Sequence, residues 1–165
     1  MRIVVISPNP WEWQYQLKAY ENEPVLIDCF GWLDPHSIDV IKNLTEMTQN
    51  RLVDQQSCND IILILDEVSN MRYLDEESQV YLNFLYTSGP QARVWPFASI
   101  SADMDHPNND MLDLFKTWIF GHVNSLPGIF SQERNDKDLV ANEPGQFSIN
   151  LEGKWFSYRL PMIGR

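Results

Sequence analysis

Short runs of aliphatic residues alternate with longer amphipathic stretches along the first two thirds of the chain. The runs RIVVI (2–6), PVLIDCF (24–30) and IILIL (61–65) have the length and composition of strands. Five consecutive aliphatic residues at 61–65 leave no polar side for water, which predicts a central strand of a parallel sheet, buried on both faces. A fourth strand is expected in RVWPFASIS (93–101), where Pro96 implies a bulge.

The stretches between these runs predict helices. Asp34 is placed to cap a helix that begins at Pro35 and ends near Arg51. Its apolar positions lie three residues apart, at Ile38, Ile41, Leu44 and Met47. A second helix is predicted over 75–88, because it opens with DEE, where the helix dipole favours anions, and closes at Gly89-Pro90.

The last third of the chain carries three further patterns. A helix is predicted after Asn108 or Asn109. Its apolar positions follow the i, i+3, i+4, i+7 spacing: Met111, Leu114, Phe115 and Trp118. The run WIFGHV (118–123) is a candidate strand, and GQFSINLEGKWFSYRL (145–160) is a candidate β-hairpin with its turn at Glu152-Gly153.

Strands that alternate with helices predict an α/β fold with a three-layer, mostly parallel sheet. The 165 residues are 44% hydrophobic and contain no repeat, low-complexity stretch or Ser/Gly linker, so a single domain over 1–165 is expected. Ligands of such sheets bind beyond the carboxyl ends of the strands. Asp66 and Glu67 directly follow the strand at 61–65 and are expected at that edge. They could equally solvate the strand end or cap the next turn.

Charge and cysteine content narrow the function classes. The chain has 12 Lys and Arg against 23 Asp and Glu, a net charge of -11, which opposes direct binding to nucleic-acid phosphates or anionic membranes. Only two cysteines are present, without CxxC spacing, and we expect buried free thiols and no zinc site. No apolar run approaches the ~18 residues of a membrane helix, so we expect a cytoplasmic or intraviral protein.

The aromatic residues favour packing or a protein interface over base stacking. Trp11, Trp13 and Tyr15 alternate in WEWQYQ, but this segment contains no Lys or Arg to follow a phosphate backbone. Aromatic side chains are also enriched at the centres of protein interfaces. A protein partner is therefore the better expectation.

Six segments, taken in order, carry a family resemblance. They are VVISPNPWEW (4–13), SIDVIKNLTEMTQNRL (37–52), IILILDE (61–67), LYTSGPQARVWPFASISADMD (85–105), LFKTWIFGHVNS (114–125) and LVANEPGQFSIN (139–150). Together they resemble the C-terminal two thirds of the FtsK/HerA-type P-loop ATPase core, in which IILILDE would be the Walker B strand. The resemblance implies a RecA-like fold. It implies that Asp66 positions magnesium, that Glu67 orients the attacking water, and that Ser101, in the sensor region, contacts nucleotide.

The departures from that family concern its catalytic groups. No GxxxxGK[ST] stretch is present, so the amide cradle and the lysine that hold the phosphates are missing. Ser7 replaces the family's acidic residue, and Trp118 stands where its arginine would fall. Arg93 is not in register with the interface arginine, and we do not assign it an arginine-finger role. No cofactor is expected unless a partner supplies a P-loop for Mg-ATP.

These observations predict an incomplete or degenerate ATPase domain with no stand-alone ATPase activity. Because several separate positions differ, degeneration is favoured over a fragment whose P-loop half lies on another polypeptide. The expected role is a noncatalytic or partner-dependent subunit of a DNA-translocating, packaging or secretion assembly. A sheet edge without its P-loop strand would need covering, which predicts a protein partner or a homo-oligomer. The alternative is an acidic protein that binds or inhibits another protein and has no nucleotide chemistry. Mimicry of a nucleic acid is one form of this alternative.

Overall fold

The computed structural model describes residues 1–20, 24–54, 58–101, 114–115, 117–121, 145–151 and 154–159. The chain forms two compact units, residues 1–100 and residues 101–165, and each is described by itself. The single domain over 1–165 stays a prediction.

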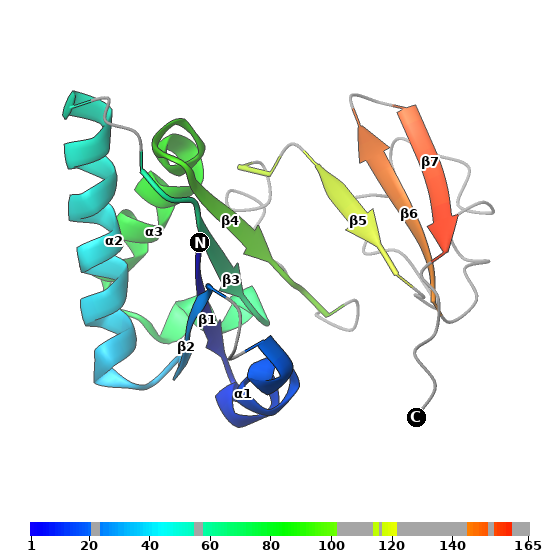
Figure 1. Ribbon diagram of the computed structural model, residues 1–165, viewed down its shortest axis with the longest axis horizontal. Coiled ribbons are helices and arrows are strands. Elements are labelled where there is room, and N and C mark those ends of the chain that lie inside the picture. Colours follow the sequence, from blue (N-terminus) through cyan, green and yellow to red (C-terminus); the bar gives the residue numbers. More distant parts are fainter. Residues whose placement is uncertain are drawn as a thin grey trace. The chain divides into compact units, whose positions relative to one another are not determined.

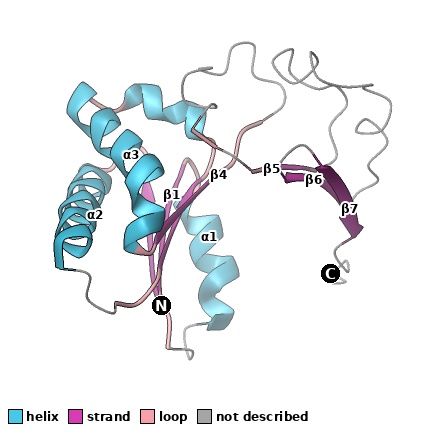
Figure 2. Cartoon of the chain, turned by 90° about the horizontal axis from the view of Figure 1, so that it is seen from above, coloured by secondary structure: helices cyan, strands magenta, loops and turns pink. Residues whose placement is uncertain are grey.

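The first unit is a parallel α/β sheet with helices on both faces. Its elements are β1 (Arg2–Ser7), α1 (Pro10–Leu17), η1 (Lys18–Tyr20), β2 (Leu26–Gly31), α2 (Pro35–Asp54), β3 (Ile61–Leu65), η2 (Val68–Tyr73), α3 (Glu76–Ser88), η3 (Gly89–Ala92) and β4 (Val94–Ala98). The strand order is β2-β1-β3-β4, and every neighbouring pair is parallel (Figure 1). Helices α2 and α3 cover one face, while α1 lies on the other (Figure 2). The predicted three-layer α/β fold is confirmed, as a partial RecA-like sheet.

Strand β3 is central, as its sequence predicted, but its two faces are buried to different degrees. Ile61, Leu63 and Leu65 are buried on the face covered by α2 and α3. Ile62 and Ile64 on the opposite face are only half-buried. The reason is that α1, the helix described on that face, packs against β1 and β2. Burial on both faces was therefore an overestimate.

Helix α2 begins at Pro35 as predicted and ends at Asp54 rather than near Arg51. The Asp34 Oδ1 atom accepts a hydrogen bond of 2.9 Å from the backbone N–H of His36, as an N-cap does. The buried face is rotated from the predicted stripe and consists of Ser37, Ile41, Leu44, Thr45 and Thr48. Burial of the two threonines is possible because their hydroxyls donate to the carbonyls one turn earlier, at 3.0 and 2.7 Å.

Helix α3 and strand β4 also follow the prediction. The side chain of Asp75 accepts from the backbone N–H of Ser78 at 2.7 Å and caps α3. Pro96 lies within β4, and no bulge is needed because β4 is an edge strand. Helix α1 was not predicted. It has Pro10 at its first turn and no buried residue, so its sequence lacks an apolar stripe.

The second unit is an antiparallel sheet in the order β5-β6-β7, formed by β5 (Trp118–Phe120), β6 (Gln146–Leu151) and β7 (Lys154–Arg159). The two strands of the predicted hairpin and the strand at 118 are confirmed, while the turn at 152–153 lies outside the described residues. The helix expected after Asn108 or Asn109 lies mostly outside them. The prediction is wrong for the C-terminal end of this helix, because Leu114 and Phe115 are not helical and Trp118 pairs with β6.

Neither cysteine forms a disulfide, as expected, but both are half-buried rather than buried. Burial, followed by the negative charge of Asp28, raises the pKa of the Cys29 thiol. None of the described helices is long and apolar enough to cross a membrane.

Candidate functional site

The carboxylate of Asp66 lies at the carboxyl end of β3 and accepts three hydrogen bonds. Its Oδ2 atom accepts from the hydroxyl of Ser7 at 2.8 Å and from the indole Nε1 of Trp13 at 3.0 Å. Its Oδ1 atom accepts from the hydroxyl of Ser99 at 2.7 Å. The backbone carbonyl of Asp66 accepts from Nε1 of Trp32 at 2.7 Å. We call these five residues the Asp66 cluster.

The topology of the sheet explains why these residues meet. Ser7 ends β1, Trp32 follows β2, Asp66 follows β3 and Ser99 follows β4. The carboxyl ends of parallel strands lie along one edge of a sheet, so the four residues come together there. Trp13 reaches the same place from α1. The cluster thus joins every strand of the first unit to Asp66, β1 and β4 through its carboxylate and β2 through its backbone carbonyl.

Backbone groups fix the direction of both serine hydroxyls. The N–H of Asn9 donates to Ser7 Oγ at 3.0 Å, and the N–H of Glu67 donates to Ser99 Oγ at 2.9 Å. Each hydroxyl therefore accepts from the backbone and donates its proton to Asp66. Because Ser7 is fully buried, its hydroxyl cannot bond to bulk water and depends on these hydrogen bonds.

All three donors to the Asp66 carboxylate are neutral. Burial of this carboxyl raises the pKa of Asp66, but the hydrogen bonds from Trp13, Ser99 and Ser7 lower it more, and the net pKa lies below its ordinary value of 3.8. The group is therefore ionised at neutral pH. Among the described residues it has no ion-pair partner, and hydrogen-bond donors stabilise its charge.

This pKa predicts acid-sensitive stability. Because the pKa of Asp66 is lower in the folded chain than in the unfolded one, its contribution is present above pH 3.8 and is lost as the pH falls through the folded value. Urea unfolding between pH 7 and pH 3 should show this loss in the wild type and a shallower loss in Asp66→Asn. Equal pH dependence in the two proteins would contradict it.

Glu67 has an unusual backbone but a free side chain. Its φ of 51° is left-handed, a conformation that non-glycine residues rarely adopt. Its backbone N–H bonds to Ser99 and its carbonyl accepts from Asn70, whereas no hydrogen bond reaches its carboxylate from the described residues. The Glu67 carboxylate is thus available to a ligand or partner, unlike that of Asp66.

Ser101 is not part of the cluster. It is the first residue of the second unit, and the serine that contacts Asp66 is Ser99, two positions earlier. The proposed nucleotide contact of Ser101 stays a prediction. No sequence signal marked Ser99, because the fourth strand was predicted over 93–101 and ends at Ala98 in the structure, directly before Ser99.

The residues present do not by themselves fit a magnesium nucleotide. Both lone pairs of Asp66 Oδ2 are used by Ser7 and Trp13, and Oδ1 already accepts from Ser99. Magnesium prefers near-octahedral oxygen ligands, commonly one or two carboxylates with substrate phosphates. Within the described ranges, no group of three or more His, Cys, Asp or Glu side chains could hold a metal ion.

Arg93 lies at the other end of the sheet. It forms a bidentate ion pair with Asp60, with Nε to Oδ1 at 2.9 Å and NH2 to Oδ2 at 2.8 Å, and Trp95 Nε1 also donates to Asp60 at 3.2 Å. Asp60 directly precedes β3 and Arg93 directly precedes β4, so the pair marks the amino ends of these strands.

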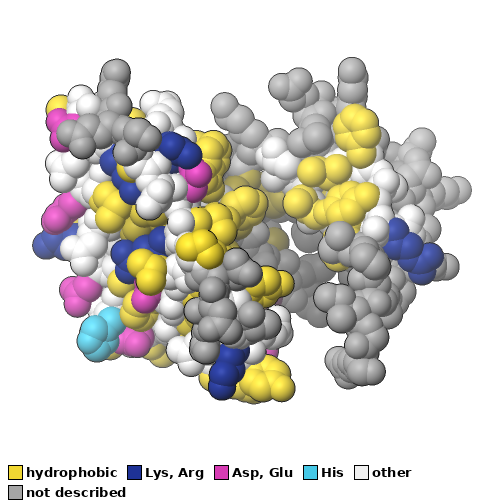
Figure 3. All heavy atoms as spheres, in the orientation of Figure 1, with side chains coloured by type: hydrophobic (Ala, Val, Ile, Leu, Met, Phe, Trp, Pro, Cys, Tyr) yellow, Lys and Arg dark blue, Asp and Glu magenta, His cyan; other side chains and the backbone are white. Residues whose placement is uncertain are grey.

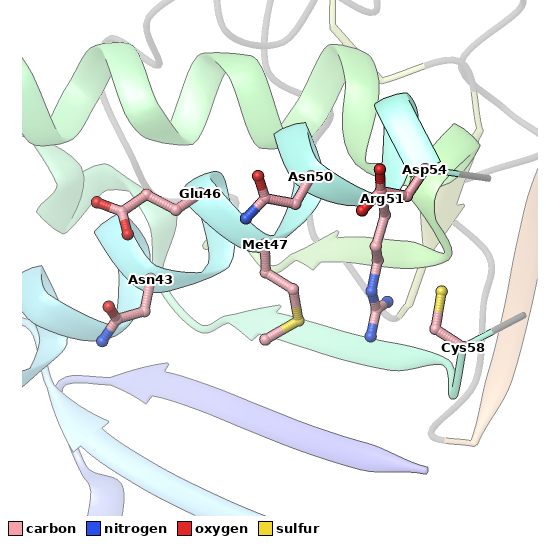
Figure 4. Close-up of a pocket in the computed structure, with 7 residues that line it drawn as sticks. All are labelled: Asn43, Glu46, Met47, Asn50, Arg51, Asp54 and Cys58. Carbon is pink, nitrogen blue, oxygen red and sulfur yellow. The ribbon is translucent and has the colours of Figure 1, made fainter. Parts of the chain in front are cut away.

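A cavity of about 500 Å³ lies along α2 (Figure 4). It is lined by Asn43, Glu46, Met47, Asn50, Arg51, Asp54 and Cys58. The Arg51 guanidinium donates to the carbonyl of Ala92 at 3.1 Å, which ties α2 to the start of β4. Cys58 precedes β3, so the cavity belongs to the amino end of the sheet and contains no cluster residue.

Comparisons with known proteins identify a fold. No protein-family model and no curated protein matches the sequence. The solved structure of the cytoplasmic domain of EssC matches with a TM-score of 0.53 and 13% identity, over 97% of this chain and 33% of that chain. At this identity the match shows a shared fold. The chain thus spans about a third of the EssC chain it matches.

Proposed function

We propose that this chain is a noncatalytic subunit or domain related to the FtsK/HerA-type ATPases, and that it acts through protein contacts. The observation that carries the proposal is the commitment of the Asp66 carboxylate to three neutral donors within the fold. A Walker B carboxylate must keep its oxygens accessible to a hydrated magnesium ion. In this chain the equivalent strand-end carboxylate stabilises the sheet edge.

The family relation has two supports. The ordered segments around IILILDE resemble the FtsK/HerA core, and EssC, whose cytoplasmic domain shares the fold, is an FtsK/SpoIIIE-family ATPase. These two observations support a relation to the secretion-type members of this group. A role in DNA translocation has less support, because the net charge of -11 opposes contact with phosphate backbones.

Calorimetric titration with Mg-ATP tests the noncatalytic role. We expect no saturable heat up to about 1 mM nucleotide for the wild type, because the sequence contains no phosphate cradle and the Asp66 carboxylate already accepts three hydrogen bonds. Asp66→Asn should give the same flat titration. The matched control is Asp60→Asn, which removes an aspartate charge at the amino end of the sheet. Saturable binding that only Asp66→Asn abolishes would refute the proposal.

One observation favours a partner-dependent variant of this role. The left-handed Glu67 is held at the strand end with a carboxylate that has no partner among the described residues. Strained backbone of this kind is found at functional sites. If a partner brings a P-loop, the same titration repeated with that partner should show Mg-ATP binding and hydrolysis, and Glu67→Gln should remove the hydrolysis while leaving the binding.

A further inference from the structure

The two outer edges of the parallel sheet differ in their ability to pair with another strand. In β4, the carbonyl of Arg93 and the N–H of Ser99 bond to β3. Hydrogen-bonding direction alternates along a strand, so Val94, Pro96 and Ala98 face outward. The outward position in the middle of β4 is thus a proline, which has no N–H to donate. This edge is blocked against regular strand pairing.

The edge formed by β2 carries no such block. The N–H of Leu26 bonds to the carbonyl of Met1, so Leu26, Asp28 and Phe30 face β1. The outward backbone groups belong to Ile27, Cys29 and Gly31. In the described part of the chain none of their N–H groups has a hydrogen-bond partner, whereas the Gly31 carbonyl accepts from the N–H of Asp34 at 3.1 Å. A run of unpaired N–H and C=O groups along an edge is a template for strand addition.

We propose that β2 pairs antiparallel with β2 of a second copy of this chain, about a two-fold axis at Cys29. In this register Cys29 faces Cys29 of the other copy, and Ile27 faces Gly31, so outward N–H groups meet outward carbonyls. The Gly31 carbonyl, which accepts from Asp34, would use its second lone pair for this bond. The two parallel sheets then form one continuous sheet. Pro96 at the far edge ends this sheet on each side.

The charges of β2 select this register. Asp28 is the only charged residue in β2, and Arg2 of β1 neutralises it, with Arg2 Nε to Asp28 Oδ2 at 2.9 Å. An axis at Cys29 sets Asp28 opposite Phe30 of the other copy. An axis one residue earlier would set Asp28 opposite its own copy, and like charges directly opposite are destabilising. The β2 strands of two copies can thus pair without placing carboxylates opposite each other, although each chain has a net charge of -11.

Exposed apolar side chains adjoin the same edge. Leu26 begins β2 and is 70% exposed, and Leu33 follows β2 and is 78% exposed. Trp11 and Tyr15, one turn apart on α1, are 64% and 81% exposed on the helix that packs against β2. Hydrophobic side chains also reach the surface over α1 in the space-filling view (Figure 3). A second copy at β2 would remove such side chains from water.

Sedimentation of the full chain between about 1 µM and about 1 mM tests the pairing. We expect a reversible monomer–dimer equilibrium. Leu33→Glu adds a negative charge just past the end of the β2 edge and should raise the dimer dissociation constant at least about tenfold. Val53→Glu is the matched control, because Val53 is 81% exposed at the end of α2 and gives the same charge change. A monomer at every concentration, or equal effects of both variants, would overturn the proposal.

Cysteine cross-linking tests the register. Residues in a hydrogen-bonded antiparallel pair have Cα atoms about 5.5 Å apart, within reach of a disulfide. Diamide, which takes up the two electrons and two protons of the thiols, should trap a Cys29–Cys29 dimer at alkaline pH. Cys58→Ser should keep this dimer, and Cys29→Ser should lose it. A dimer that depends on Cys58 instead would contradict the Cys29 axis.

Discussion

Replacing Asp66 by alanine is expected to lower the free energy of unfolding by about 3 kcal/mol. The change leaves the hydroxyls of Ser7 and Ser99 and the indole N–H of Trp13 without their acceptor. Ser7 is fully buried and has no access to water as a replacement. Each hydrogen bond to a charged group contributes about 1.5–3 kcal/mol, and the half-buried position of Asp66 reduces the sum. Urea unfolding at pH 7 measures the difference.

Asp66→Asn is the matched control, because it removes the same charge but keeps an acceptor. Its amide oxygen can accept from Ser7 and Trp13, while its NH₂ group donates to the hydroxyl of Ser99, which has a second lone pair. We expect a loss of at most about 1 kcal/mol. Equal losses in the alanine and asparagine variants would show that charge, rather than the hydrogen bonds, sets the stability of the cluster.

The position of the site, but not its composition, could be predicted from the sequence. Asp66 was expected at the carboxyl end of a central parallel strand because five aliphatic residues precede it, and β3 lies between β1 and β4. Its partners come from segments up to 59 positions away, as for Ser7. Linear spacing does not report such distances. The order of the strands in the sheet determines which residues meet, and this order is a property of the fold.

Trp13 was missed for a different reason. It lies in α1, which contains no buried residue and therefore lacks the apolar periodicity by which helices are recognised. The helix is held at the sheet partly by the bond from Trp13 to Asp66. The alternation of aromatic residues in WEWQYQ predicted packing or a protein interface rather than base stacking, but it did not indicate a hydrogen-bond donor to a carboxylate. The polar end of an indole gives no signal in a hydrophobic pattern.

Trp118 shows how a short apolar run can support two interpretations. The spacing from Met111 to Trp118 fits a helical face, while WIF alone fits a strand. The strand forms because residues 118–120 pair with β6, and stacking of Trp118 on Phe120, with ring centroids 6.5 Å apart, places both on one face. Pairing with β6, which is distant in the sequence, therefore determines that these residues form a strand rather than a helix. A short stretch of sequence contains no information about that pairing.

Gly89→Ala is expected to lower the free energy of unfolding by about 2 kcal/mol. The sequence favoured a glycine stop after α3, but its φ of -53° is right-handed, so positive-φ freedom is not the reason for glycine here. A Cβ atom at this position would lie 2.8 Å from the backbone carbonyl oxygen of Val94, so the start of β4 would have to shift. The better helix propensity of alanine offsets this by at most about 1 kcal/mol.

Gly31→Ala is the control for this prediction. A Cβ atom at Gly31 would have only the Cβ of Asp34 nearby, at 4.0 Å, which is an ordinary contact. We expect a change within about 0.5 kcal/mol. Urea unfolding of both variants separates the two causes: a large loss at Gly89 alone means that close backbone packing requires the glycine. Equal, small effects would mean that β4 can shift to make room for the added methyl group. Ser99 at the end of β4 would then move as well, which contradicts a strand end held in place by its hydrogen bond to the Asp66 carboxylate.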